Sequence, residues 1–200
     1  MTLTRRQALA LSLAVAALPS IGLAQTRVQE MTMGDANAPV TLVEYAMLTC
    51  PHCAAFHAEV FPQIKANFID TGKVRLVFRE VYFNKPSLWA AMIARCAPSD
   101  RYFGIVERMF ETQADWVGVE DSEAMLDKLY GIGRQAGLTD AEMDACMRDR
   151  AQAEALVAEY QKNAGADAIE ATPTFLIDGK KVSNMGYEEF EAELNAALGS

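Results

Sequence analysis

The sequence lacks several features that would point to a particular class of protein. Its 200 residues contain no internal repeat and no low-complexity linker. Basic residues are few: 18 Lys and Arg stand against 27 Asp and Glu, a net charge of −9. Such a surface repels phosphate backbones, so we expect no nucleic-acid partner. The apolar run at residues 8–18 is too short for a membrane span, which needs about 20 residues.

Residues 1–24 predict a cleaved export signal. Arg5 and Arg6 precede the apolar run, and small residues lead up to a cleavage site after Ala24. Cleavage there leaves 16 basic and 27 acidic residues, a net charge of −11. The stretch "TRRQAL" resembles a twin-arginine signal without its usual phenylalanine, so ordinary secretion stays open. The alternative is an N-terminal anchor or a buried helix. We expect a soluble periplasmic protein after cleavage, in a compartment where disulfides persist.

The rest of the chain predicts an α/β fold with a helical insertion. Residues 27–83 have the pattern β-β-α-β, because alternating apolar residues flank a stripe with a spacing of four residues. Residues 86–165 are helical, with breaks near Pro98, Gly118 and Gly137. Asp178-Gly179 then predicts a hairpin, and a last helix follows. At 51% hydrophobic residues, the chain can form a core without help from disulfides.

The stretch "CPHC" at residues 50–53 carries most of the functional information. A structural metal site usually needs four ligands, and this pair supplies two. His57 could be a third ligand, and Cys96 or Cys146 a fourth, but no second Cys-x-x-Cys accompanies the motif. A purely structural disulfide over so short a loop would stabilise little. A redox-active pair is the better interpretation, and no metal or other cofactor is expected.

Local chemistry favours a reactive thiol at Cys50. The motif lies where a strand gives way to a helix, so unpaired backbone N–H groups and the helix dipole favour a thiolate there. Pro51 suits the first helical turn, where no amide hydrogen is missed. His52 adds to the effect if it is protonated or donates a hydrogen bond. Cys53, one turn further on, is positioned to resolve a mixed disulfide.

A second stretch completes a resemblance to a known family. "TPTF" at residues 172–175 precedes a hairpin and a final helix, after an inserted helical block and the "CPHC" motif. This combination resembles the DsbA family of thiol-disulfide oxidoreductases over about residues 27–198. The resemblance implies a thioredoxin-like mixed sheet interrupted by an inserted α-helical domain. The expected parts are 1–24 signal, 25–84 thioredoxin-like with CPHC, 85–165 helical, and 166–200 thioredoxin-like with the cis-proline loop.

The resemblance also implies roles for individual residues. Cys50 corresponds to the exposed nucleophile and Cys53 to its buried partner. Pro173 matches a cis-proline that faces the disulfide, and Thr172 before it would bind the substrate backbone. Glu44 matches an acid beneath the active site. It shares a strand face with apolar residues, so a buried carboxylate that relays the proton of Cys53 is expected, with an ion pair at a strand end as the alternative.

The function expected from these features is disulfide formation in exported proteins. The substrates would be reduced or unfolded secreted proteins, and the family implies reoxidation by a quinone-linked membrane partner. Thr172 stands where the best-known DsbA has valine, and the Thr-Pro pair recurs among related disulfide isomerases. An isomerase or a reductase that uses the same cysteines therefore stays open. A metal-binding protein is the alternative of another class.

Cys96 and Cys146 lie in the helical block. Each could be a small buried apolar residue. Some bacterial DsbA relatives carry a second, non-catalytic disulfide in this block, and the resemblance therefore favours a structural Cys96–Cys146 bond. Spacing alone cannot determine the connectivity.

Overall fold

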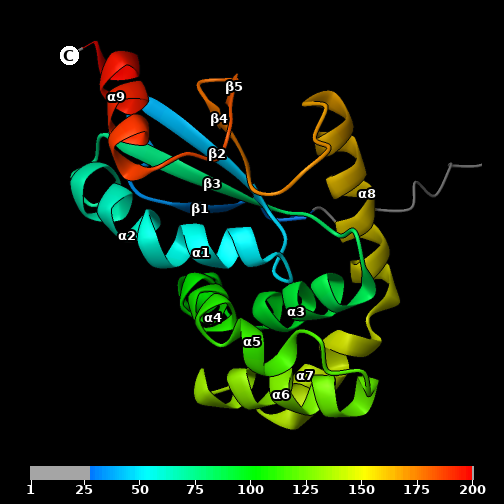
Figure 1. Ribbon diagram of the computed structural model, residues 1–200. Coiled ribbons are helices and arrows are strands. Elements are labelled where there is room, and N and C mark those ends of the chain that lie inside the picture. The colour runs from blue at the N-terminus through cyan, green and yellow to red at the C-terminus, as the bar shows by residue number, and fades with distance from the viewer. Residues whose placement is uncertain (1–27, 200) are drawn as a thin grey trace, which may run out of the picture.

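The computed structural model describes residues 28–199, so the expected export signal lies outside the described residues. A five-stranded sheet is surrounded by helices (Figure 1). Its strands are β1 Met31–Met33, β2 Val40–Ala46, β3 Val74–Glu80, β4 Thr174–Ile177 and β5 Lys180–Val182. The helices are α1 Pro51–Glu59, α2 Phe61–Ile64, the π-helical turn η1 Lys65–Ile69, α3 Lys85–Cys96, α4 Ser99–Glu111, α5 Gln113–Trp116, α6 Ser122–Gln135, α7 Asp140–Arg148, α8 Arg150–Ala166 and α9 Tyr187–Leu198. This mixed sheet with a helical insertion confirms the expected fold class.

The sheet has the strand order β1-β3-β2-β4-β5. β2 and β3 are parallel, whereas the β1–β3, β2–β4 and β4–β5 pairs are antiparallel. A parallel pair requires a crossover, and the helical segment from α1 to η1 supplies it. Glu44 lies in the central strand, opposite Phe78 on one side and Phe175 on the other. The Glu44 side chain is thus attached to the middle strand of the sheet.

Local sequence accounts for most element boundaries. Pro62 lies in the first turn of α2, where its missing N–H breaks the helical ladder that began with α1. Thr139 and Glu142 form the expected capping box at the start of α7. Asp178 and Gly179 both have positive φ, 46° and 83°, and form the two-residue turn between β4 and β5.

Helices cover both faces of the sheet. α1, α2 and α9 pack on one face, where a cluster of apolar residues includes Phe56, Ile64, Phe175 and Phe190. The C-terminal end of α8 covers the other face, and Figure 1 shows this helix running from the helical block back to the sheet. The helical block packs beneath α1, and its apolar cluster contains both Cys50 and Cys53. The cysteine pair therefore lies at the contact between the sheet and the block.

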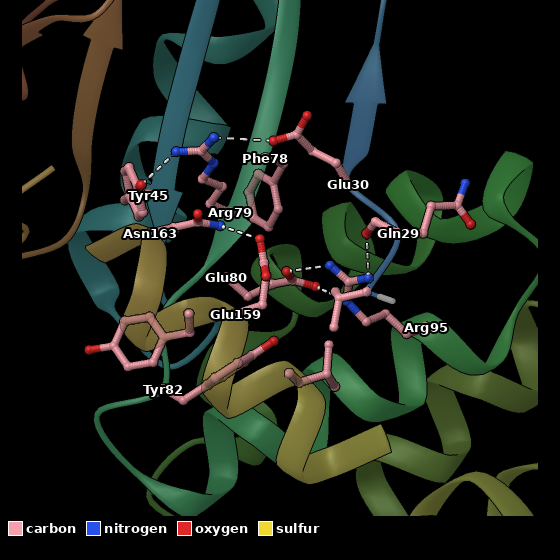
Figure 2. Close-up of a pocket in the computed structure, with 13 residues that line it drawn as sticks. Gln29, Glu30, Tyr45, Phe78, Arg79, Glu80, Tyr82, Arg95, Glu159 and Asn163 are labelled. Atoms are coloured by element: carbon pink, nitrogen blue, oxygen red, sulfur yellow. Dashed lines mark hydrogen bonds and ion pairs between the residues drawn. The ribbon is translucent and has the colours of Figure 1, made fainter. Parts of the chain in front are cut away.

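A buried ion pair also links the sheet to the block. Arg95 on α3 contacts both carboxylate oxygens of Glu80 on β3, at 2.6 and 2.7 Å. The hydroxyl of Tyr102 on α4 donates to the same carboxylate at 2.7 Å. Figure 2 shows Arg95 pointing toward Glu80 at the wall of a pocket. A buried charge needs such partners, and here they come from two elements, α3 and α4.

A helix that spans a membrane needs about 20 consecutive, mostly apolar residues. None of the helices in residues 28–199 combines the length and the apolar composition that a membrane-spanning helix requires.

Candidate functional site

The N-terminus of α1 positions the two cysteines. Cys50 is the residue before the helix, with extended backbone, and Pro51 occupies the first helical turn. Cys53 follows within that turn, and its backbone N–H donates to the carbonyl of Cys50 at 3.1 Å. Both cysteines are free thiols in the structure. The side chain of Cys50 remains 6% exposed, whereas Cys53 is fully buried, so only Cys50 can meet another protein.

The environment of Cys50 favours its thiolate. Its pKa is lowered to about 5, first by a hydrogen bond from the Cys53 thiol, against the opposing effect of burial. The Thr172 side chain and the backbone N–H groups of Cys53 and His52 lower the pKa further. The two backbone donors belong to the start of α1, and the N-terminus of a helix favours a thiolate. Cys50 is therefore largely ionised at neutral pH.

Cys53 has the opposite properties. Its pKa is raised above the ordinary range of a thiol, first because its hydrogen bond to Cys50 favours the protonated form. Burial, the charge of Cys50 and the charge of Glu44 act in the same direction. The two cysteines thus differ in protonation state, with a thiolate at Cys50 and a protonated thiol at Cys53.

His52 contributes through its backbone rather than its ring. The side chain is exposed, and within residues 28–199 no hydrogen bond from its ring is found. Its N–H group nevertheless belongs to the set that lowers the pKa of Cys50. An effect of the imidazole charge on Cys50 stays a prediction.

The loop before β4 lies against Cys50. The Thr172–Pro173 peptide bond is cis, and Pro173 is buried. The Cys50 thiol can donate to the backbone carbonyl of Thr172, 3.3 Å from its sulfur. The Thr172 side chain, by contrast, lowers the pKa of Cys50, so it favours the thiolate. The two contacts serve different protonation states of the same sulfur.

Glu44 lies beneath the pair and is buried with a partner. Its side chain has no exposed surface, and its Oε1 lies 2.9 Å from Nε2 of His57. Its other carboxylate oxygen, Oε2, has no hydrogen-bond partner among the described residues. Glu44 is thus a buried carboxylate inside β2 that contacts His57, and its part in proton relay stays a prediction.

Two polar residues that hold the cysteine loop were not identified from the sequence. The amide of Gln113 on α5 donates to the carbonyls of Leu48 and Cys50, at 2.8 and 3.0 Å. Asn84 contacts the Thr49 hydroxyl at 3.1 Å and caps α3 through Ser87. Gln113 is 63 residues from Cys50, and no local pattern distinguishes it from an ordinary helical glutamine.

The residues considered as metal ligands do not converge. Cys96 and Cys146 are joined to each other by a disulfide between α3 and α7, and His57 pairs with Glu44. Among residues 28–199, no group of three or more His, Cys, Asp and Glu side chains is placed to hold a metal ion. The arrangement supports thiol chemistry at Cys50 rather than a metal centre built from the named ligands.

The pocket in Figure 2 is separate from the cysteines. It lies between β3, α3 and α8, with a volume of about 40 Å³. That is space for only a few water molecules. Its wall contains ion pairs of Arg79 with Glu30 and of Arg95 with Glu80, and none of Cys50, Thr172 and Pro173. We therefore place the candidate active site at the start of α1 and not in this pocket.

Known proteins are similar to this chain in sequence and in fold. A Rickettsia bellii protein named as a protein-disulfide oxidoreductase is 31% identical over 84% of this chain. The match covers 64% of that relative, so the chain spans less than two thirds of its length. Disulfide bond formation protein D of Bacillus subtilis is 28% identical over 83% of this chain and 76% of its own. The crystal structure of Wolbachia pipientis alpha-DsbA1 has a TM-score of 0.77 and 28% identity, covering 86% of this chain and 92% of that one.

A family model described as thioredoxin matches residues 26–196, which includes both cysteines, the cis-proline loop and the helical block. Because this match extends over most of the chain, the chain belongs to the thioredoxin family.

Proposed function

We propose that the protein is an exported thiol-disulfide oxidoreductase that introduces disulfides into secreted proteins. The observation that carries the proposal is the opposite protonation of the two thiols, with Cys50 ionised and Cys53 protonated. An enzyme that stabilises its own reduced form drives the oxidation of other thiols. The names of the Rickettsia and Bacillus relatives support the same chemistry.

The pKa of Cys50 gives the size of the free energy that favours the reduced form. An ordinary thiol is almost fully protonated at pH 7, whereas Cys50, with a pKa of about 5, is ionised. Two pH units separate that pKa from pH 7, which corresponds to roughly 3 kcal/mol in favour of the reduced form. Solvent screening at a partly accessible sulfur reduces this value. The full amount would raise the reduction potential by about 60 mV.

The catalytic cycle uses the residues at the start of α1. A substrate thiolate attacks Sγ of Cys50 in the Cys50–Cys53 disulfide, and Cys53 leaves as a thiolate that takes up a proton. A second substrate thiolate then attacks the substrate sulfur of the mixed disulfide and releases the Cys50 thiolate. The substrate loses two electrons and the enzyme gains them. Reoxidation requires an electron acceptor, for which we propose a quinone-linked membrane partner.

The surroundings of Cys50 suit an unfolded substrate. Thr172, with its carbonyl 3.3 Å from the sulfur, offers backbone groups to an extended peptide. Phe83 is 50% exposed, and among residues 28–199 no other large hydrophobic side chain is as accessible. It directly precedes Asn84, whose side chain contacts Thr49 beside Cys50. An apolar surface next to the reactive sulfur would bind unfolded chains without reading their sequence.

The proposal is tested by activity on defined substrates. Equilibration with glutathione should give a reduction potential well above that of thioredoxin, about −270 mV. The oxidised protein should then form disulfides in a reduced substrate protein faster than it rearranges a scrambled one. A potential near that of thioredoxin would indicate a reductase. Faster repair of the scrambled substrate would indicate an isomerase, the alternative that Thr172 keeps open.

Export is tested separately. We propose that residues 1–24 direct the protein to the periplasm. N-terminal sequencing of the protein from a bacterial periplasmic fraction should give Gln25 as the first residue. Recovery of the uncleaved chain from the cytoplasm would contradict this part of the proposal.

A further inference from the structure

The buried pair of Glu44 and His57 lies beside the thiol that must exchange a proton. His57 is on α1, one helical turn after Cys53, and its Nε2 lies 2.9 Å from Oε1 of Glu44. The charge of Glu44 acts on Cys53, so the carboxylate is close to that thiol. Oε2 of Glu44 has no hydrogen-bond partner in the described part of the chain. This oxygen can therefore exchange a proton with Cys53, directly or through one water molecule.

Aromatic rings hold the imidazole in place. His57 stacks on Phe110 of α4 with 4.4 Å between ring centroids and 24° between ring planes. Phe61 lies 4.7 Å away on another side, and Phe56 and Phe78 make edge contacts. The His57 side chain is only 6% exposed. Its orientation toward Glu44 is thus determined by packing rather than by solvent.

His57 also lines a pocket that opens between α1 and α4. The pocket has a volume of about 450 Å³ and is lined by Ala54, Ala55, His57, Ala58, Pro62, Glu107, Phe110 and Glu111. Neither Cys50 nor the Thr172–Pro173 loop contributes to it. Two exposed carboxylates, Glu107 and Glu111, line the pocket, and Glu111 is paired with Arg108 at 3.2 Å. Glu44 contacts the imidazole directly. Carboxylates attract cations and protons to such a pocket.

We propose that Glu44 and His57 carry the proton of Cys53 to and from this pocket, on a side of α1 away from the substrate loop. When the Cys50–Cys53 disulfide opens, the Cys53 thiolate takes a proton from the Glu44 carboxyl. Glu44 regains one from the His57 imidazolium, and the imidazole takes one from water in the pocket. In total, one proton passes from the pocket water to Cys53, and Glu44 and His57 return to their starting protonation states. On reoxidation the same path runs in reverse. The proposal rests on the dithiol chemistry proposed above and adds His57 to it.

A separate path has a mechanistic reason. In the mixed disulfide, the substrate is bonded to Cys50 and covers the more accessible of the two active-site cysteines. Cys53 is fully buried, and burial raises the pKa of its thiol even when Cys50 carries the substrate, so its thiolate should take up a proton while the substrate is still bound. A path through the α1–α4 pocket stays open to water at that moment. Histidine suits its outer end because the ordinary pKa of imidazole lies near neutrality.

The test compares two variants of His57. His57→Gln keeps a side chain that can donate to Glu44 but cannot carry a proton, whereas His57→Ala leaves a space beside the pocket. Opening of the oxidised active site by dithiothreitol should slow by about 100-fold or more in both, the lower end of the range for a lost acid–base group. Imidazole added to His57→Ala should restore the rate, and added to His57→Gln it should not. Alkylation of reduced Cys50 should be unchanged in both variants.

Two results would overturn the proposal. Full activity in His57→Gln would show that the residue only orients Glu44. A His57→Ala variant that is folded and slow but indifferent to imidazole would show a packing defect. Dithiothreitol reduces the disulfide whether the protein acts as an oxidase or as a reductase. A thioredoxin-like reduction potential of the wild type would therefore refute the oxidase proposal alone. The rate comparison would still test the proton path.

Discussion

At the scale of single residues, the chemistry depends on two identical side chains with different surroundings. Cys50 is a helix N-cap with donors around its sulfur, and Cys53 sits three residues later in a closed apolar cluster. The hydrogen bond between them stabilises the thiolate of the first and the thiol of the second. Only Cys50 is therefore ionised near neutral pH. This difference determines how many protons are taken up with the two electrons when the Cys50–Cys53 disulfide is reduced.

The pH dependence of the reduction potential follows from that count. Below the pKa of Cys50, about 5, reduction takes up two protons, and above it only Cys53 takes one. The potential should fall by about 60 mV per pH unit below pH 5 and by about 30 mV per unit from pH 6 to 8. Depression of the Cys50 pKa favours the reduced form above pH 5, and the benefit is lost as pH falls through 5. Glutathione equilibria across pH measure the slope; a constant 60 mV per unit up to pH 8 would contradict the ionised Cys50.

A second residue-scale prediction separates the backbone of His52 from its ring. His52→Pro removes the N–H that hydrogen-bonds to Cys50, while His52→Ala keeps it and removes only the imidazole. We expect the Pro variant to raise the pKa of Cys50 more than the Ala variant does. The thiolate absorbance of each reduced variant, titrated against pH, gives the two values. A larger effect of His52→Ala would mean that the ring, not the amide, lowers the pKa.

At the scale of elements, local signals in the sequence predicted most of the fold. The capping box at Thr139, the turn at Asp178-Gly179 and the proline after Cys50 all act within a few residues. The hydrogen bonds of Gln113 and the stacking of His57 on Phe110 join positions more than 50 residues apart, and no local pattern predicts them. The sequence predicts His57 only as a polar helical residue or a metal ligand. Its contact with Glu44 forms when α1 packs on β2, and no local pattern predicts that packing.

The disulfide between α3 and α7 gives a prediction at this scale. It closes a loop of 50 residues, so the chain-entropy model assigns it about 4 kcal/mol of stability. Replacing Cys96 and Cys146 together by alanine should lower the free energy of unfolding by roughly that amount in urea denaturation. Neither cysteine is among the groups that shift the pKa of Cys50, which are Cys53, Thr172 and His52. The pKa of Cys50 should therefore be unchanged, and a large shift would show that the bond acts on the active site.

At the scale of the whole molecule, the sheet and the helical block share one core. The apolar cluster around Cys50 and Cys53 also contains Tyr102, Met109 and Trp116 from the block. The division into parts 25–84, 85–165 and 166–200 stays a prediction about chain organisation. A shared cluster nevertheless implies that loss of the block exposes the active site, so the two should unfold together.

The contact between Arg95 and Glu80 provides the test of that coupling. Both side chains are less than 10% exposed, so Arg95→Met leaves the Glu80 carboxylate buried without its cation. Removal of one member of such a pair should lower the free energy of unfolding by about 3–5 kcal/mol. The double variant Glu80→Gln/Arg95→Met removes both charges and is the matched control, which should recover much of the loss. The fluorescence of Trp89 and Trp116, both in the helical block, reports on the block, and the alkylation of Cys53 reports on the active site. In Arg95→Met both should change at the same urea concentration, lower than in the wild type, whereas separate transitions would mean that the block unfolds on its own.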